Sequence, residues 1–223
     1  MTQRYELIVF DWDGTLMDSA ARIVTCLQRA AADIGLPVPS VEASRDIIGL
    51  GLDQAMARLF PRIDRPGREA LVAAYRGHWL DDRVAASPMF AGAAELIGDL
   101  HGAGYLLAVA TGKSRRGLDR ALAQSGLGDC FHATRCADEA HSKPHPQMLE
   151  EILTDLDTPC DATLMVGDTE YDMQMAASAG VGAVGVEHGV HTRERLLQSG
   201  AQACVADLFA LSQWIGRPLA IDS

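Results

Sequence analysis

The chain has 223 residues, of which 48% are hydrophobic and 22% are charged, as is ordinary for a globular protein with one large domain or a medium domain plus an insert. Its net charge of −11 argues against nucleic acid as the main partner, because binding to phosphate backbones needs a basic surface. No apolar stretch is long enough to span a membrane, and the run Leu7–Phe10 is too short for a signal peptide. We therefore expect a cytoplasmic monomer or homodimer that binds neither nucleic acid nor membranes.

The cysteines and lysines of the chain indicate where disulfides, metal sites and required positive charges are to be expected. The five cysteines are scattered without a CxxC pair, so we expect reduced thiols rather than disulfides or a metal site. Only two of the nineteen basic residues are lysine, Lys113 and Lys143. Because lysine and arginine differ in size, hydration and reach, these two positions are candidates for a required ammonium group.

The first part of the chain, up to Pro88, is predicted to form one strand followed by helices. The strand covers Tyr5–Phe10, a short apolar run that is stopped by Asp-x-Asp-Gly. A helix follows over Ser19–Ile34, with Ser19 as a plausible N-cap and apolar residues at helical spacing. Shorter helices are predicted over Ser44–Ile48, Leu52–Phe60 and Arg68–Leu80. No strand is predicted between Leu16 and Pro88, so this stretch is expected to be a helical subdomain.

Strands alternate with helices after Pro88. The predicted strands are Tyr105–Ala110, His132–Cys136, Thr163–Val166, Gly182–Val186 and, more weakly, Ala203–Val205. The predicted helices are Ala93–Ala103, Arg116–Ser125, Pro146–Leu156 and Glu170–Ser178. Such alternation is typical of a parallel sheet covered on both faces. We predict an α/β fold, with a doubly wound parallel-sheet (Rossmann-like) core over residues 1–16 and 89–223 and an inserted helical cap over residues 17–88.

Polar residues follow three of the predicted strands. Asp11 and Asp13 follow the first strand, Thr111 and Gly112 the second, and Asp168 a later one. Ligands of such sheets bind beyond the carboxyl ends of the strands, so these side chains are expected to converge. Three crowded carboxylates repel one another, and a hard divalent cation such as Mg²⁺ would relieve that repulsion.

The same residues suit phosphoryl transfer. A carboxylate such as Asp11 can attack phosphorus, and Asp13, two residues on, can exchange protons with the leaving group and with water. The Thr111 hydroxyl and the Gly112 N–H precede a predicted helix, where an anion is favoured. Lys143, in Ser-Lys-Pro before another predicted helix, offers a fixed positive charge for the phosphoryl group.

Three further charged residues lie close to these motifs in the sequence, and they are expected to have different roles. Asp172 lies four residues after Asp168, so the two share one face of a helical turn, and Asp172 could accept a bond from Lys143 or from metal-bound water. Glu170 is predicted to face solvent. Lys113 directly follows Thr111-Gly112, and it either lines the site entrance or faces solvent.

Together these segments resemble the haloacid dehalogenase-like hydrolase superfamily. The segment Phe10–Leu16 resembles its first motif, Thr111-Gly112 its second, Lys143 its third, and Gly167-Asp168 with Asp172 its fourth. The resemblance implies that Asp11 is the nucleophile, that Asp13 is the acid/base, and that Thr111 and Lys143 bind phosphate. It also implies Mg²⁺ held by Asp11, Asp168 and the backbone carbonyl of Asp13.

Within the superfamily the chain looks most like phosphoglycolate phosphatases with a small helical cap, on the strength of Asp18-Ser19, Gly49-Leu50-Gly51 and Lys143-Pro144-x-Pro146. The resemblance implies hydrolysis of a small phosphate ester, phosphoglycolate-like or a sugar phosphate. Two activities of the family are not expected. Dehalogenases lack the second aspartate, which is present here as Asp13, and phosphonoacetaldehyde hydrolases need a cap lysine, which residues 17–88 do not contain.

Other activities remain open at this point. They are a phosphomutase of the β-phosphoglucomutase type, a pyrophosphatase, and a non-catalytic phospho-acceptor or binding protein. Candidate substrate contacts in the cap are Arg22, Arg45, Arg58 and His78, although each residue type is more often found on the surface.

Overall fold

A six-stranded parallel sheet forms the centre of the larger part of the molecule. The computed structural model describes residues 5–80 and 87–216. The strands are β1 (Leu7–Phe10), β2 (Leu106–Thr111), β3 (Ala133–Cys136), β4 (Thr163–Gly167), β5 (Gly182–Val186) and β6 (Ala203–Val205). Their order in the sheet is β3-β2-β1-β4-β5-β6, and every neighbouring pair is parallel. The doubly wound α/β fold expected from the sequence is confirmed.

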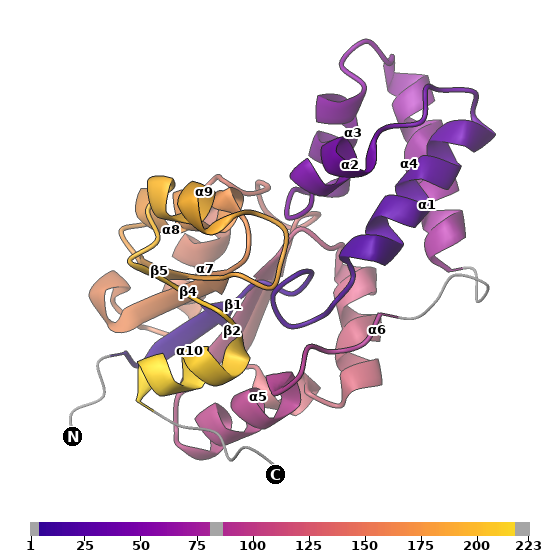
Figure 1. The fold of residues 1–223 in the computed structure, drawn as a ribbon. Coiled ribbons are helices and arrows are strands. Elements are labelled where there is room, and N and C mark those ends of the chain that lie inside the picture. Colours follow the sequence, from indigo (N-terminus) through magenta and orange to yellow (C-terminus); the bar gives the residue numbers. More distant parts are fainter. Residues whose placement is uncertain (1–4, 81–86, 217–223) are drawn as a thin grey trace.

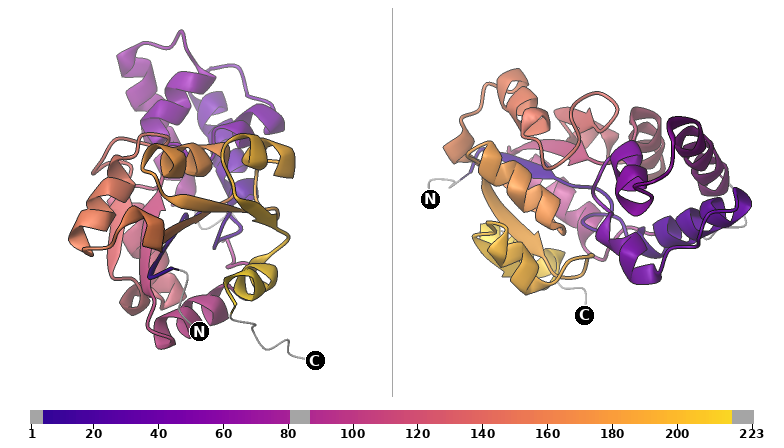
Figure 2. Two further views of the ribbon diagram at one scale, coloured as in Figure 1. Left: turned by 90° about the vertical axis from the view of Figure 1, so that its left-hand side faces the viewer. Right: turned by 90° about the horizontal axis from the view of Figure 1, so that it is seen from above.

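Helices cover both faces of this sheet (Figures 1 and 2). The helices of the sheet-containing part are α5 (Ala93–Gly102), α6 (Arg115–Ser125), α7 (Gln147–Asp155), α8 (Glu170–Ser178), α9 (Arg193–Gln198) and α10 (Leu208–Ile215). Short 3₁₀ turns lie at Gly128–Cys130 and Cys160–Ala162.

Alternation along the strands decides which helices cover which face, because successive side chains point to opposite sides of a sheet. On β1, Ile8 and Phe10 pack in a cluster with α5, α6 and α10. Leu7 and Val9, on the other face, pack with α7, α8 and α9. All four side chains are fully buried, so β1 is the centre of a three-layer core.

Four further helices form a separate body beyond the carboxyl ends of the strands, at the upper right in Figure 1. They are α1 (Ala20–Asp33), α2 (Val41–Asp46), α3 (Leu52–Leu59) and α4 (Arg65–Trp79). This body, here called the cap, has its own apolar cluster, with Leu27, Met56 and Leu71 buried at its centre. One member of the cluster comes from outside the cap, since Tyr171 on α8 is buried in it.

Two segments join the cap to the sheet-containing part, and they run side by side. The N–H of Asp18 donates to the carbonyl of Pro88, and the N–H of Phe90 donates to the carbonyl of Leu16. Met17 forms an isolated antiparallel bridge with Met89. We propose residues 17–88 as the bounds of the cap, and residues 1–16 and 89–223 as those of the core.

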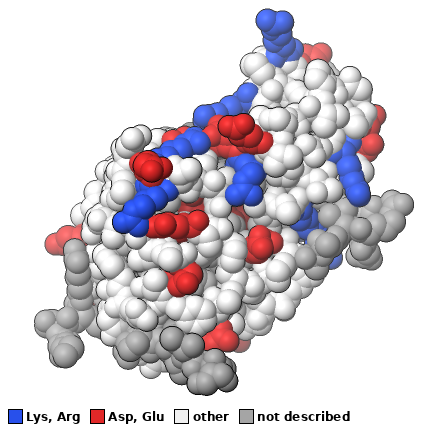
Figure 3. Space-filling model, viewed as in Figure 1, with Lys and Arg blue, Asp and Glu red and all other residues white. Residues whose placement is uncertain are grey.

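The cap rests on the core through a set of polar contacts, here called the latch. The Gly51 N–H donates to Ser142 Oγ at 2.6 Å. Tyr171 Oη donates to the Asp46 carbonyl at 2.6 Å, and Arg195 pairs with the Asp46 carboxylate at 2.5 Å. On the face drawn in Figure 3, acidic and basic side chains accordingly lie side by side where the two parts meet. The cap is therefore in contact with the core.

Several helix bounds differ from the sequence prediction for identifiable reasons. The helix expected at Ser44–Ile48 begins at Val41, because Ser40 caps it by accepting from the Ala43 N–H. The helix expected from Arg68 begins at Arg65, capped by Asp64, since proline is tolerated in a first turn. Helices α9 and α10 were not predicted.

Membrane-spanning helices and disulfides were the subject of two expectations, and the described residues contain neither. No helix within residues 5–80 and 87–216 combines the length and the apolar character needed to cross a bilayer. None of the five cysteines, all of which lie in this part of the chain, forms a disulfide.

Candidate active site

The predicted site residues meet where the strand order reverses. Strand β1 has β2 on one side and β4 on the other, and ligands bind at such a switch point in open α/β sheets. Asp11 follows β1, Thr111 ends β2 and Asp168 follows β4. All three residues are fully buried.

Asp11 and Asp172 share one buried lysine. Lys143 Nζ lies 2.8 Å from Asp11 Oδ1 and donates to Asp172 Oδ1 at 2.6 Å, and none of the three side chains is exposed. Burial alone would lower the pKa of Lys143, but the charges of Asp11 and Asp172 raise it above its ordinary value. Lys143 therefore stays charged between two carboxylates, as the sequence led us to expect for Asp172.

The pKa of Asp11 is raised to about 7, chiefly because burial disfavours its charged form. Lys143 lowers that pKa, while the charges of Asp172 and Asp13 raise it. Asp11 Oδ2 is buried and accepts no hydrogen bond from any described residue. The positive charge of Lys143 therefore does not fully offset the effect of burial on the Asp11 carboxylate.

Asp168 is fixed in a narrow space. It accepts hydrogen bonds from Thr15 Oγ1 and from the Val190 N–H, each at 2.9 Å. A Cβ on either Gly14 or Gly189 would lie 2.2 Å from an atom of the Asp168 side chain, and Gly14 also has a φ of +89°. Only glycine fits these two positions. Burial and the charges of Asp11 and Asp172 raise the pKa of Asp168 well above its usual value.

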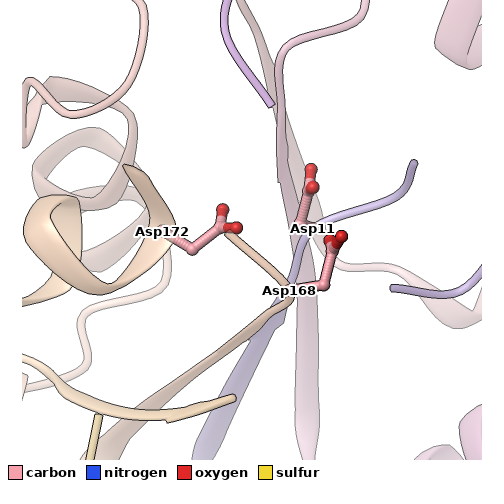
Figure 4. A group of neighbouring side chains, drawn as sticks. All are labelled: Asp11, Asp168 and Asp172. Atoms are coloured by element: carbon pink, nitrogen blue, oxygen red, sulfur yellow. The ribbon is translucent and has the colours of Figure 1, made fainter. Parts of the chain in front are cut away.

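These carboxylates fit a divalent cation. Ligand atoms of Asp11, Asp168 and Asp172 lie within 4.8 Å of one another, and Figure 4 shows the three carboxyl groups side by side. A hard cation would supply the charge that Asp11 Oδ2 lacks. The side chain of Asp13 is not in this group, and the contribution of its backbone carbonyl to a metal site stays a prediction. Asp172 is already engaged by Lys143.

Asp13 is held by two partners that the motifs alone did not assign to it. Ser19 Oγ donates to Asp13 Oδ1 at 2.6 Å, and Lys113 Nζ reaches both carboxylate oxygens at 2.8 and 2.9 Å. Ser19 does stand at the N-cap position of α1, but its hydroxyl makes no cap bond. Lys113 thus belongs to the site rather than to the solvated surface, with its side chain only 9% exposed.

Thr111 and Gly112 lie directly beneath the cap. Thr111 Oγ1 accepts from the Lys113 N–H at 3.2 Å, which leaves the hydroxyl proton of Thr111 free to be donated. A Cβ on Gly112 would lie 2.6 Å from the carbonyl oxygen of Leu50 and 2.7 Å from that of Gly49. Gly112 therefore allows the cap loop to approach the end of β2.

A cavity of about 740 Å³ separates the cap from the core around this point. Asp11, Asp13, Thr111 and Gly112 are among its lining residues. Lys143 is not among the described lining residues, but its ammonium group lies 2.8 Å from the carboxylate of Asp11, which does line the cavity. The contact of Lys143 with phosphate stays a prediction.

None of the four cap residues suggested as substrate contacts lines the cavity among the described residues. Arg22 donates to the Trp79 carbonyl, Arg45 to the Gly189 carbonyl. Arg58 pairs with Asp46, and His78 with Asp33. These side chains hold the cap together or hold it to the core.

Glu170 also departs from expectation, because it does not face solvent. It pairs with Arg195 at 2.6 Å, and its side chain is 18% exposed. The hydrogen bond from Arg195 holds the pKa of Glu170 below its usual range. Since Arg195 also pairs with Asp46, Glu170 supports the latch. Nothing in the local sequence pattern signals this contact, which joins residues far apart in the chain.

The family follows from a match that spans most of the chain. The model of the haloacid dehalogenase-like hydrolase family matches residues 8–186. The chain belongs to this family. It is 35% identical over 203 residues to "Probable phosphatase IndB" of Dickeya dadantii, a match covering 89% of this chain and 88% of that protein.

Further relatives point in the same direction. The "Phosphoglycolate phosphatase" of Rhodospirillum rubrum is 32% identical over 221 residues, with 95% of this chain and 91% of that protein covered. Among solved structures, a hydrolase from Pseudomonas syringae superposes with a TM-score of 0.86 at 22% identity, covering 94% of this chain and 97% of that one, which supports the fold. The chain is thereby placed among the phosphatases of the family, and the resemblance to phosphoglycolate phosphatases is confirmed.

Proposed function

We propose that this protein hydrolyses a small organic phosphate monoester in a Mg²⁺-dependent reaction with an aspartyl-phosphate intermediate on Asp11. The observation that carries the proposal is Asp11 itself. Its carboxylate is buried at the switch point of the sheet, lines the cavity, and has one oxygen without a hydrogen bond among the described residues. Lys143, 2.8 Å away, keeps positive charge beside it.

In the first half of the proposed reaction a carboxylate oxygen of Asp11 attacks phosphorus, and the bond from phosphorus to the ester oxygen breaks. A protonated Asp13 gives its proton to the leaving alkoxide. The Thr111 hydroxyl and the Gly112 N–H, both at the cavity floor, donate to the phosphoryl oxygens. Each of these groups is in place before substrate enters.

In the second half Asp13 removes a proton from water, which attacks the phosphorus of the acyl phosphate and frees inorganic phosphate and Asp11. Ser19 and Lys113 fix the orientation of Asp13 for both steps. The two halves together consume one water and produce one alcohol and one phosphate.

Asp11, Asp168 and the backbone carbonyl of Asp13 would hold the cation. When bound, Mg²⁺ offsets the repulsion between the phosphate and these carboxylates. The raised pKa values of Asp11 and Asp168 support this assignment, because the ionised pair needs a further positive charge.

The first test is hydrolysis of p-nitrophenyl phosphate. We expect turnover that EDTA abolishes and Mg²⁺ restores, and that Asp11→Asn reduces by at least about 10³-fold, in the range for loss of a catalytic nucleophile. Asp161→Asn is the matched control, because Asp161 is exposed and lies in a 3₁₀ turn away from the lining residues. Full activity of Asp11→Asn would contradict the mechanism, whereas absence of Mg²⁺-dependent turnover in the parent protein would favour a binding protein.

A second test separates hydrolysis from the related activities. With glucose 1-phosphate as substrate, a phosphatase releases inorganic phosphate, whereas a mutase of the β-phosphoglucomutase type yields the 6-phosphate isomer. With pyrophosphate, preferential turnover over every monoester would favour a pyrophosphatase. We expect phosphate release from monoesters without an isomer.

A further inference from the structure

The cavity above Asp11 is large and mainly apolar on its cap side. Its volume of about 740 Å³ lies within the range of pockets that enclose drug-sized ligands. This side is here called the apolar wall, and it is formed by Leu27 on α1, Leu50 in the cap loop, Leu52 and Met56 on α3, and Tyr75 and Trp79 on α4. A substrate of two or three carbons would leave most of this volume unfilled.

This volume is not the result of a raised cap. The Gly51 N–H donates to Ser142 Oγ, and Tyr171 Oη donates to the Asp46 carbonyl. The cap loop also lies so close to Gly112 that even a methyl group would not fit between them. The space over Asp11 therefore exists while the cap is latched.

The aromatic end of the wall is held in one orientation. The rings of Tyr75 and Trp79 stack at 6.1 Å. Lys113 Nζ lies 4.7 Å from the centroid of the Trp79 ring, and so does the guanidinium carbon of Arg22, which also donates to the Trp79 carbonyl at 2.6 Å. Side chains fixed in this way lose little freedom when a ligand binds.

The charged groups that the structure describes around the cavity provide no buried cation on the cap side for a second anionic group of a small substrate. Among the described lining residues the cap supplies one cation, Arg76, and that residue is exposed. The core adds Lys113, which pairs with Asp13, and the exposed Arg116 and Arg120. Asp53 and Asp138 contribute charge of the opposite sign. The buried part of the cap side thus offers apolar contact rather than a site for a second anionic group.

From these observations we infer that the alcohol part of the substrate is a mainly apolar ring system of about bicyclic size, which packs against the apolar wall while its phosphate reaches Asp11. The inference rests on the proposed phosphatase function and specifies its substrate class. Phosphoglycolate and sugar phosphates were expected from family motifs, and of the residues in these motifs only Leu50 belongs to this wall.

Matched alkyl esters test the inference without changing the chemistry of the leaving group. 2-(1-Naphthyl)ethyl phosphate and propyl phosphate both release a primary alcohol, and phosphoglycolate serves as the compact substrate with a second anionic group, its carboxylate. We expect kcat/KM for the naphthylethyl ester to exceed that for propyl phosphate by at least about tenfold, since even one buried methylene is worth about that much in an apolar pocket.

Variants of the wall then locate the effect. Trp79→Ala and Leu52→Asn, two lining positions on different cap helices, should each lower the ratio of the two kcat/KM values at least fivefold. Val41→Asn should leave that ratio unchanged, because Val41 is a cap residue that is 56% exposed and does not line the cavity. Thermal unfolding confirms that each variant is folded.

The outcomes separate this inference from the function on which it rests. Equal or better turnover of propyl phosphate or phosphoglycolate, with Asp11→Asn inactive on all three esters, would overturn the apolar substrate class and leave the phosphatase intact. An unchanged ratio in both wall variants would also overturn it. Absence of Mg²⁺-dependent turnover of every ester would overturn the proposed function, and the inference with it.

Discussion

A single methyl group at Gly112 tests whether the contact between cap and core matters for catalysis. The added Cβ would lie 2.6 Å from the Leu50 carbonyl oxygen, whereas ordinary van der Waals contacts of this kind begin near 3.4 Å. The cap loop must therefore retreat by about 0.8 Å. The neighbouring atoms are backbone, so no side-chain rotation relieves the overlap, and alanine keeps the N–H that we assign to phosphate binding.

A misplacement of about 1 Å can reduce an enzymatic rate by about 10²-fold. For Gly112→Ala we accordingly expect kcat/KM for p-nitrophenyl phosphate to fall by about tenfold to a hundredfold, equivalent to about 1.4–2.7 kcal/mol of activation free energy. Gly77→Ala is the control, because a Cβ on this cap helix residue meets nothing within 4 Å. Wild-type kcat/KM in a folded Gly112→Ala protein would refute the reasoning.

Two further predictions concern stability. Lys143→Met leaves Asp11 and Asp172 buried without their shared cation, and we expect urea unfolding at pH 7 to show a loss of about 3–5 kcal/mol; a change below about 1 kcal/mol would contradict this. Burial alone would raise the pKa of Asp46, but Arg195 lowers it below its usual value, so this pair stabilises the fold above about pH 4 and the contribution disappears as acid protonates Asp46. Asp46→Asn should therefore be slightly less stable than the parent at pH 7, and the difference should become smaller as the pH falls below about 4 in urea titrations. An unchanged difference at acidic pH would count against the latch.

The strands and the convergence of site residues could be predicted from the sequence because both depend on local pattern. The run Leu7–Phe10 is apolar on both sides and ends abruptly in an aspartate, which is the pattern of a central strand of a parallel sheet. Once the strands are assigned, topology alone brings Asp11, Thr111 and Asp168 to one edge.

Pairings between charged residues far apart in the chain could not be predicted in this way. The pairing of Lys113 with Asp13 joins residues 100 positions apart, and that of Arg195 with Asp46 joins residues 149 apart. Neither has a sequence signature, since a charged residue in a loop is usually solvated. Helix α9, six residues long, was missed because so short a segment has too few turns to show a period. Whether Asp11 and Asp13 play the chemical roles assigned to them stays a prediction.

The position of Tyr171 limits how freely the cap can be exchanged. This residue belongs to the core sequence, one position before Asp172, yet its side chain is buried in the apolar cluster of the cap and its hydroxyl reaches Asp46. A chimaera that receives the cap of a relative would therefore also need a compatible residue at 171, although that position lies far outside the transplanted segment. To acquire a new specificity by replacement of its cap, this protein must therefore change at two separate places in its sequence.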